Sequence, residues 1–143
     1  MSQNGDLKEL DCSNNDIREL DLSQNTRLTR LDCPNNGLGK LDLSQNTELT
    51  SINCENNGIY RLDATNCNKL RHITCHSNSL KNNGLNLPDY STEYGKTIYF
   101  KIMDNIPADQ NKLTPAEVQT IRQKGWYVMA KTWSSWNDYK GED

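Results

Sequence analysis

Large aromatic side chains and long hydrophobic runs are scarce in this chain. Its 143 residues include one phenylalanine, three tryptophans and six tyrosines, against 19 asparagines. Hydrophobic residues make up 34% of the chain, and adding glycine raises the apolar share to about 40%, below the ~45–50% of an ordinary globular domain. No apolar run approaches the ~18 residues that a membrane-spanning helix needs. The composition therefore excludes membrane insertion and argues against a large aromatic core.

A strong charge of either sign is also absent. The chain has 16 basic and 19 acidic residues, which gives a formal net charge of -3. Because nucleic-acid binding depends on a basic surface, we expect no nucleic-acid partner. The five cysteines are an odd number, which excludes a fully paired disulfide framework. They also lack the C-x-x-C spacing that is typical of zinc sites.

The dominant feature of the sequence is a repeat. Four cysteines recur at one constant spacing, at Cys12, Cys33, Cys54 and Cys75, within the segments LDCSNN, LDCPNN, INCENN and ITCHSN. A second segment follows in each unit and reads LDLSQN, LDLSQN and LDATNC. A fixed period of this length predicts a solenoid, in which stacked units bury an apolar edge that one unit cannot bury alone.

The repeated positions also predict which side chains point inward. In a strand with the pattern L-x-C, Leu10 and Cys12 face the interior while Asp11 faces outward. An asparagine follows each strand (Asn15, Asn36, Asn57, Asn78), and its amide can bond backbone groups of the turn that would otherwise be buried unpaired. Asn25 and Asn46 repeat this arrangement, with Cys67 at the equivalent position. We interpret the cysteines as small buried hydrophobic residues rather than as a metal or redox site.

The unit L-x-x-L-x-C-x-x-N-x-[LI] resembles the leucine-rich repeat. Its 21-residue spacing, with cysteine on the inward strand position, is similar to the internalin-J-like subtype of bacterial surface proteins. The resemblance covers residues 2–80. It implies an α/β leucine-rich repeat fold, a strand-rich right-handed solenoid of about four coils. It also implies a secreted or bacterial cell-surface protein involved in adhesion.

The period fails after Leu80, and the composition then changes. We therefore divide the chain into a repeat array over residues 1–87 and a capping region over residues 88–143. The capping region predicts a strand at Thr97–Met103, a helix at Pro115–Lys124 that begins with a capping box, and a strand at Trp126–Trp133. This order fits a small β-α-β cap that extends the sheet of the array. We expect Tyr99, Ile102, Val118, Ile121 and Trp126 to cover the last coil.

The chain begins inside a repeat, because its first residues SQNGDL align with SQNTRL and SQNTEL. No secretion signal precedes the array. We expect a piece of a longer or engineered protein whose remaining part holds further repeats and the targeting signal. The alternative is a short natural chain with an open end that a partner covers. The sequence does not predict an oligomeric state.

No constellation of residues predicts catalysis, so we expect neither an enzyme nor a cofactor. His72 and His76 are separated by about 13 Å along an ideal strand, too far to share a metal, and we expect both to be exposed. Asp21, Asp42 and Asp63 would stack and could bind calcium. The signature of calcium-binding solenoids is absent, however, and hydrogen bonds to turn N–H groups explain these residues equally well.

Framework positions repeat between units, whereas most outward strand positions differ. This predicts a non-catalytic binding module that engages a protein partner through the concave face of the sheet. The candidate residues are Glu9, Asp11, Arg30, Asp32, Ser51, Asn53, Glu55, His72, Thr74 and His76. One alternative is glycan binding by the aromatic residues Trp133, Trp136 and Tyr139. Another is a structural spacer or cap of a larger surface protein.

Overall fold

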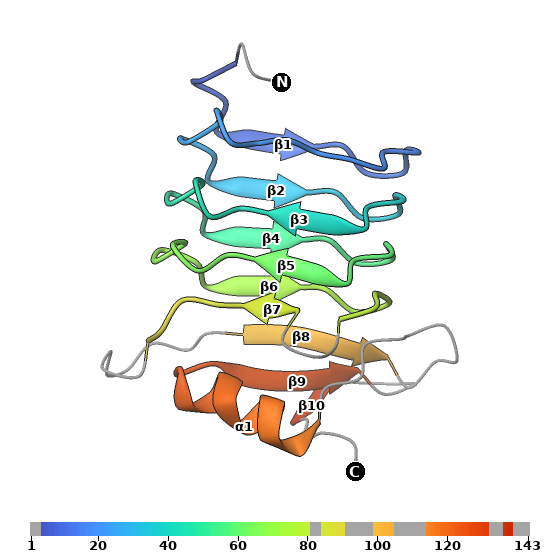
Figure 1. Cartoon of the computed structure of the whole chain (residues 1–143), viewed down its shortest axis with the longest axis vertical. Helices are drawn as coiled ribbons and strands as arrows, with labels where there is room; N and C mark the ends of the chain where they lie inside the picture. The colour runs from blue at the N-terminus through green and yellow to red at the C-terminus, as the bar shows by residue number, and fades with distance from the viewer. Residues whose placement is uncertain (1–3, 81–83, 91–98, 105–113, 132–135, 139–143) are drawn as a thin grey trace.

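The molecule is a stack of coils with a small cap at one end (Figure 1). The computed structural model describes residues 4–80, 84–90, 99–104, 114–131 and 136–138. The first described coil lies at the top of this view, and each later repeat lies one layer below the repeat before it. This arrangement confirms the predicted strand-rich leucine-rich repeat solenoid.

One parallel sheet runs the length of the array and continues into the cap. Its strands within the repeats are β1 (Glu9–Asp11), β2 (Arg30–Asp32), β4 (Ser51–Asn53) and β6 (His72–Thr74). Each pairs with the equivalent residues of the next repeat, for example Leu31 with Ile52 and Ile52 with Ile73. The sheet then adds β8 (Tyr99–Asp104) and β9 (Tyr127–Lys131) in parallel and β10 (Trp136–Asp138) in antiparallel.

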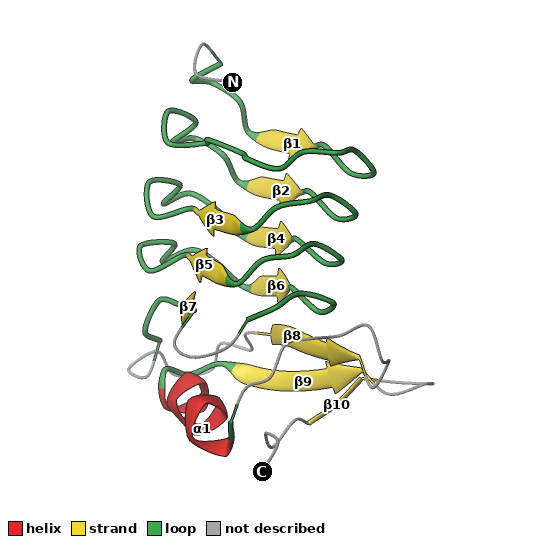
Figure 2. Cartoon of the chain, turned by 45° about the vertical axis from the view of Figure 1, so that its right-hand side comes forward, coloured by secondary structure: helices red, strands yellow, loops and turns green. Residues whose placement is uncertain are grey.

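A second sheet lies on the other side of the stack (Figure 2). It contains β3 (Lys40–Asp42), β5 (Arg61–Asp63) and β7 (Leu85–Asn86). β5 pairs with β3 at the repeat spacing, but Leu85 of β7 pairs with Leu62 although it lies two positions beyond that spacing. Two extra residues in this coil shift the strand along the sequence, but the strand still joins the second sheet. The second sheet therefore extends past Leu80, where the sequence period fails.

The interior between the two sheets consists of aliphatic side chains and thiols. Leu31 and Ile52 of the first sheet, and Leu41 and Leu62 of the second, are at most 1% exposed. Each such burial contributes roughly 1.5–3 kcal/mol. Because every strand in the repeats has only three residues, each presents a single inward side chain. Stability therefore depends on stacking of neighbouring coils.

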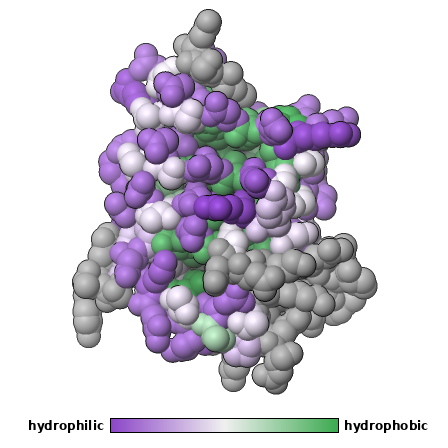
Figure 3. Space-filling view, in the orientation of Figure 1, coloured by the Kyte–Doolittle hydropathy of each residue, from purple (hydrophilic) through white to green (hydrophobic). Residues whose placement is uncertain are grey.

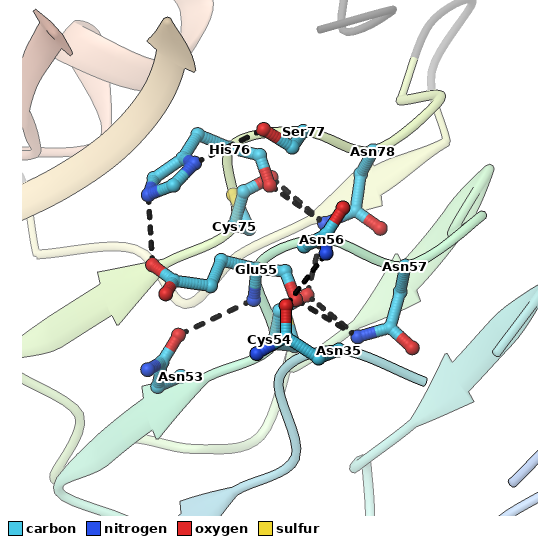
Figure 4. Close-up of polar contacts among 10 residues, drawn as sticks. All are labelled: Asn35, Asn53, Cys54, Glu55, Asn56, Asn57, Cys75, His76, Ser77 and Asn78. Carbon is cyan, nitrogen blue, oxygen red and sulfur yellow. Dashed lines mark hydrogen bonds and ion pairs between the residues drawn. The ribbon is translucent and has the colours of Figure 1, made fainter. Parts of the chain in front are cut away.

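The predicted asparagine ladder holds the turns after the first sheet (Figure 4). The side-chain amide of Asn57 donates to the carbonyl oxygen of Cys54 at 3.1 Å, as the figure shows, and to that of Cys33 one coil earlier at 3.0 Å. Its Oδ1 accepts from the backbone N–H of Leu38 at 3.1 Å. Asn36 makes the equivalent bonds one coil earlier and Asn78 one coil later. One side chain thus pairs backbone groups of two coils, which a leucine could not do.

The residue before each ladder asparagine adopts a left-handed conformation. The φ values are 56° at Asn14, 55° at Asn35, 50° at Asn56 and 54° at Ser77. Asparagine tolerates this region better than most residues. The side chains also connect the coils on the surface, because Asn35 Nδ2 donates to Asn14 Oδ1 at 2.9 Å and Asn56 Nδ2 donates to Asn35 Oδ1 at 2.6 Å.

A second internal column supports the turns after the second sheet. Asn46 Nδ2 donates to the carbonyl oxygens of Leu22 and Asn25 at 3.0 and 2.9 Å. In the next coil, the Cys67 thiol contacts the equivalent carbonyls of Leu43 and Asn46 at 3.3 and 3.4 Å. This confirms that Cys67 replaces an asparagine of the column.

Tyr90 completes this column at the cap. Its hydroxyl oxygen lies 3.0 Å from the carbonyl oxygen of Cys67 and 2.8 Å from that of Leu70, so its hydrogen can be donated to either. Tyr90 is 3% exposed, and its ring lies 5.4 Å from the ring of Trp126. Trp126 Nε1 in turn donates to the carbonyl of Pro88 at 3.0 Å. These two aromatic residues join the array to the cap.

The cap follows the predicted strand–helix–strand order. α1 (Pro115–Gln123) begins with the capping box formed by Thr114 and Glu117, and Gly125 ends it at a φ of 85°. Val118 and Ile121 are buried, as expected, and so is Trp126. Tyr99 and Ile102 lie in β8, where only the backbone is described. The antiparallel strand β10 was not predicted.

Candidate functional site

The strand face is the outward side of the first sheet, and it contains two columns of side chains. The first column is Glu9, Arg30, Ser51 and His72; the second is Asp11, Asp32, Asn53 and Thr74. The register pairs these residues directly between neighbouring strands, which places them at the ~4.8 Å strand spacing of a sheet. Nine of the ten predicted residues lie in or directly beside these columns on the surface, and His76 does not.

The first column is the more exposed of the two. Glu9, Arg30 and His72 are exposed and Ser51 is half-buried. The Arg30 guanidinium donates to Asp32 at 2.5 Å, and this hydrogen bond together with the charge of Asp32 raises the pKa of Arg30. Arg30 therefore stays charged, and its side chain is drawn across the face toward the second column.

The second column serves the turns as well as the surface. Asp11 accepts hydrogen bonds from the hydroxyl and the backbone N–H of Ser13, and these lower the pKa of Asp11. Asn53 accepts from the backbone N–H of Glu55 at 3.2 Å. Asp32 has no such donor, because Pro34 occupies the corresponding position and lacks an N–H. Asp11 and Asn53 of the second column therefore hold turns in addition to lying on the strand face.

His76 differs from the prediction, because it is 8% exposed and therefore buried. Its Nε2 lies 2.7 Å from the Glu55 carboxylate and its Nδ1 lies 3.3 Å from the Ser77 hydroxyl (Figure 4). β6 ends at Thr74 and the chain turns at Ser77, so the alternation of a strand no longer applies at His76. This histidine links two coils instead of facing a partner.

Comparison with known proteins identifies the type of array. No model of a protein family matches the chain, and no curated protein matches it in sequence. Among solved structures it is similar to one described as the functional domain of InlJ from Listeria monocytogenes, which includes a cysteine ladder. The TM-score is 0.63 and the identity 30%, over 92% of this chain and 26% of that chain.

The chain is an internalin-like leucine-rich repeat protein. It spans about a quarter of the length of the matched structure, 26%. The shared cysteine ladder agrees with the interpretation of the repeated cysteines that the sequence suggested.

The cysteine ladder of this internalin-like array is an interior packing element. All five cysteines are free, and Cys33, Cys54, Cys67 and Cys75 are buried while Cys12 is half-buried. Burial raises the pKa of the Cys33 and Cys54 thiols well above the ordinary value and that of Cys67 to about 12. Because the thiolate is the nucleophile and metal ligand, these groups are poorly suited to redox or metal chemistry.

The repeated aspartates Asp21, Asp42 and Asp63 hold turns of the internalin-like repeat, and the last two lie in the second sheet. Asp21 and Asp42 each accept from the backbone N–H two residues later, that of Ser23 or Ser44, at 3.0 Å. Asp63 does the same with Thr65 at 3.2 Å. Within the described ranges, no group of three or more histidine, cysteine and acidic side chains is arranged to hold a metal ion. No helix in those ranges has the length and apolarity to cross a bilayer.

The predicted aromatic patch falls largely outside the described residues of the internalin-like chain. Trp133 and Tyr139 lie outside them, and Trp136 is described only as the first residue of β10, in register with Lys131. A different aromatic residue was missed. Tyr127 of β9 is 50% exposed and is aligned through Tyr99 with His72, so it continues the first column of the strand face into the cap. The sequence could have indicated this exposure, because Tyr127 alternates along the predicted strand with Trp126 and Val128, which are both buried.

Proposed function

We propose that this chain is a non-catalytic binding module that engages a protein partner through the first column of the strand face. The observation that supports the proposal is the register of the sheet. Equivalent backbone positions in successive coils hold Glu9, Arg30, Ser51 and His72, four chemically different side chains on an otherwise repeating frame. In β3 and β5 of the second sheet, by contrast, the outward residues keep their charge, because Lys40 pairs with Arg61 and Asp42 with Asp63; Glu19 is the exception in the first repeat.

The character of the first column suits a polar protein surface. Its members combine an acid, a guanidinium, a hydroxyl and an imidazole, and Tyr127 adds an exposed ring at the cap end. Tyrosine and arginine are among the residues that most often dominate binding at protein interfaces. Solenoids generally use such extended faces for recognition.

The family resemblance extends the proposal to adhesion. An internalin-like array on a bacterial surface, or released from it, would bring the strand face into contact with proteins outside the cell. This part of the proposal rests on similarity, because a fold does not fix a function.

The test is a partner pull-down with matched variants. The disruptive variant combines Arg30→Glu, Ser51→Lys and His72→Glu, all in the first column. The control is Arg61→Glu on the second sheet, which changes the net charge by the same two units. Asn53 is left intact because it holds a turn.

We expect extracts of host cells to yield a protein that the wild type and Arg61→Glu retain and the triple variant loses, with circular dichroism confirming that all three are folded. Equal retention by the triple variant would refute the strand face as the binding surface. Loss by both variants would show that charge alone controls binding.

A further inference from the structure

A hollow on the outer side of the second sheet forms a site distinct from the strand face. It has a volume of about 560 Å³ and extends across the first three repeats. Arg18, Gly39 and Tyr60 occupy the same position in these three repeats, and all three line the hollow. Gly39 has no side chain, so the Tyr60 ring can lie against its backbone at the edge of the hollow. Lys40, Asp42 and Gln45 also line the hollow. A volume of this size is ordinary for a small-ligand site.

Tyr60 provides an aromatic wall that is held in place before any ligand arrives. Tyr60 is 50% exposed, although a more buried position would be the usual one for so large a side chain. A Cβ atom at Gly39 would lie 3.3 Å from Tyr60 Cε1, so the ring lies against the glycine. The Lys40 ammonium lies 5.5 Å from the ring centroid and restrains it further through a cation–π contact.

The remaining lining supplies planar and hydroxylated polar groups. Asp42 is exposed and uses Oδ1 to accept from the Ser44 backbone N–H at 3.0 Å. Gln45 Nε2 lies 3.4 Å from the Ser44 hydroxyl, which leaves its amide oxygen as an acceptor. Arg18 brings a planar fork of donors. Carboxylate, amide, guanidinium and hydroxyl groups therefore line the same hollow as the Tyr60 ring.

We propose that the Tyr60 hollow binds a neutral oligosaccharide. A sugar ring has a face of C–H groups that packs on an aromatic ring, and a rim of hydroxyls that both donate and accept hydrogen bonds. The hollow offers both kinds of partner side by side. Its charged lining comprises Arg18 and Lys40 against Glu19, Asp21 and Asp42, a near balance that favours an uncharged ligand over a sulfated or sialylated one.

This site is separate from the one proposed for a protein partner. Tyr60 and Gly39 lie beside β3 and β5 in the second sheet, whereas the strand face belongs to β1, β2, β4 and β6. Sugar binding at Tyr60 should therefore survive the triple substitution that disrupts the strand face. Either activity can be lost without the other.

The experiment is saturation-transfer difference NMR on the whole chain. The neutral probes are maltotetraose, cellotetraose, tetra-N-acetylchitotetraose and mannotetraose, and 3′-sialyllactose is the acidic comparison. The test variants are Tyr60→Ala, which removes the aromatic wall, and Gly39→Leu, whose side chain would displace the Tyr60 ring and enter the hollow. Tyr127→Ala is the matched control, because Tyr127 is exposed to the same 50% but belongs to the first sheet.

We expect at least one neutral tetrasaccharide to bind, with saturation strongest at the C–H protons of one sugar ring. Tyr60→Ala and Gly39→Leu should each weaken that binding at least tenfold, and Tyr127→Ala should leave it unchanged. Thermal melts of each variant separate loss of the site from loss of the fold. The proposal is wrong if no neutral probe binds, if a folded Tyr60→Ala protein binds as well as the wild type, or if 3′-sialyllactose is preferred.

Discussion

Replacing Asn57 by alanine is the most direct test of what holds the coils together. The Asn57 side chain is half-buried and bonds backbone groups of both the second and the third coil; Figure 4 shows its contacts within the third coil. Its two amide hydrogens are shared among the carbonyls of Cys33, Cys54 and Glu55, at 3.0 to 3.1 Å. Its Oδ1 accepts from the N–H of Leu38, a residue that is fully buried.

The expected loss follows from counting these hydrogen bonds. Two donated bonds and one accepted bond disappear, and the backbone groups left behind cannot all reach water. At about 1–1.5 kcal/mol for each bond, with unpaired buried groups at the upper end, the free energy of unfolding should fall by roughly 3–5 kcal/mol. For a chain of this length, this corresponds to a drop in melting temperature of about 10 °C or more.

The matched control is Asn56→Gly at the neighbouring residue. Asn56 is exposed and has a φ of 50°, which glycine adopts without strain. Its side chain makes one surface bond, to Asn35, so the change in stability should stay below about 1 kcal/mol. Both variants would be measured by thermal and chemical denaturation. A melting temperature for Asn57→Ala within about 3 °C of the wild type would refute the reasoning about the ladder.

Three further measurements address the cap, the thiols and the histidines. Gly125→Ala should destabilise the cap by about 1–3 kcal/mol, because φ is 85° and a Cβ atom would lie 2.9 Å from the backbone of Tyr90; an unchanged thermal melt would contradict this. Burial raises the pKa of Cys67 to about 12 from an unfolded value of 9.0, so its contribution to stability is complete below pH 9 and is lost progressively toward pH 12. The denaturant midpoint should therefore be lower at pH 10.5 than at pH 8, and the difference should be smaller in Cys67→Ala. His76→Ala should cost about 1–2 kcal/mol and His72→Ala less than about 0.5 kcal/mol; equal effects in denaturation would show that burial does not separate the two histidines.

The sequence predicted the array well because its interior repeats one geometry. A constant lag placed leucine, cysteine and asparagine at equivalent points of each coil, and the strand register follows that lag from β1 to β6. The capping box at Thr114 was equally readable, since its two residues satisfy each other's backbone within one turn. Local rules and a fixed period were sufficient for these elements.

The junction between the array and the cap could not be predicted in this way. Leu85 joins the second sheet after two extra residues, and a search at a fixed lag discards such a match. Tyr90 has the same role as Asn46 and Cys67 although it is a different type of residue. Its longer side chain brings a hydroxyl to the same kind of turn carbonyl. The structural role was retained there while the sequence pattern was not.

The outward direction of the side chains was predicted correctly within the regular strands and incorrectly at His76, beyond the end of a strand. Alternation holds for Arg30 and Asp32, which flank the buried Leu31. It fails at His76, beyond the end of β6, because the chain turns into the left-handed conformation of Ser77. A repeated Asn-Asn pair, with Ser77 at the equivalent position, was the signal for that turn.

Residues that differ from the repeat consensus are of two kinds. Those inside the stack maintain the coil, whereas those on the outside can vary without a cost to the fold. Inside the stack, Cys67 and Tyr90 differ from the asparagine of their column but contact the same kind of turn carbonyl, so the coil is maintained. Outside the stack, exchanging Ser51 or Tyr60 would remove no hydrogen bond in the frame of the coils. In the view of Figure 3, hydrophilic side chains cover much of the described surface, and hydrophobic groups are visible between them. Because the side chains of outward residues such as Ser51 make no hydrogen bond that the coils need, variation between repeats at those positions can alter binding while the fold is retained.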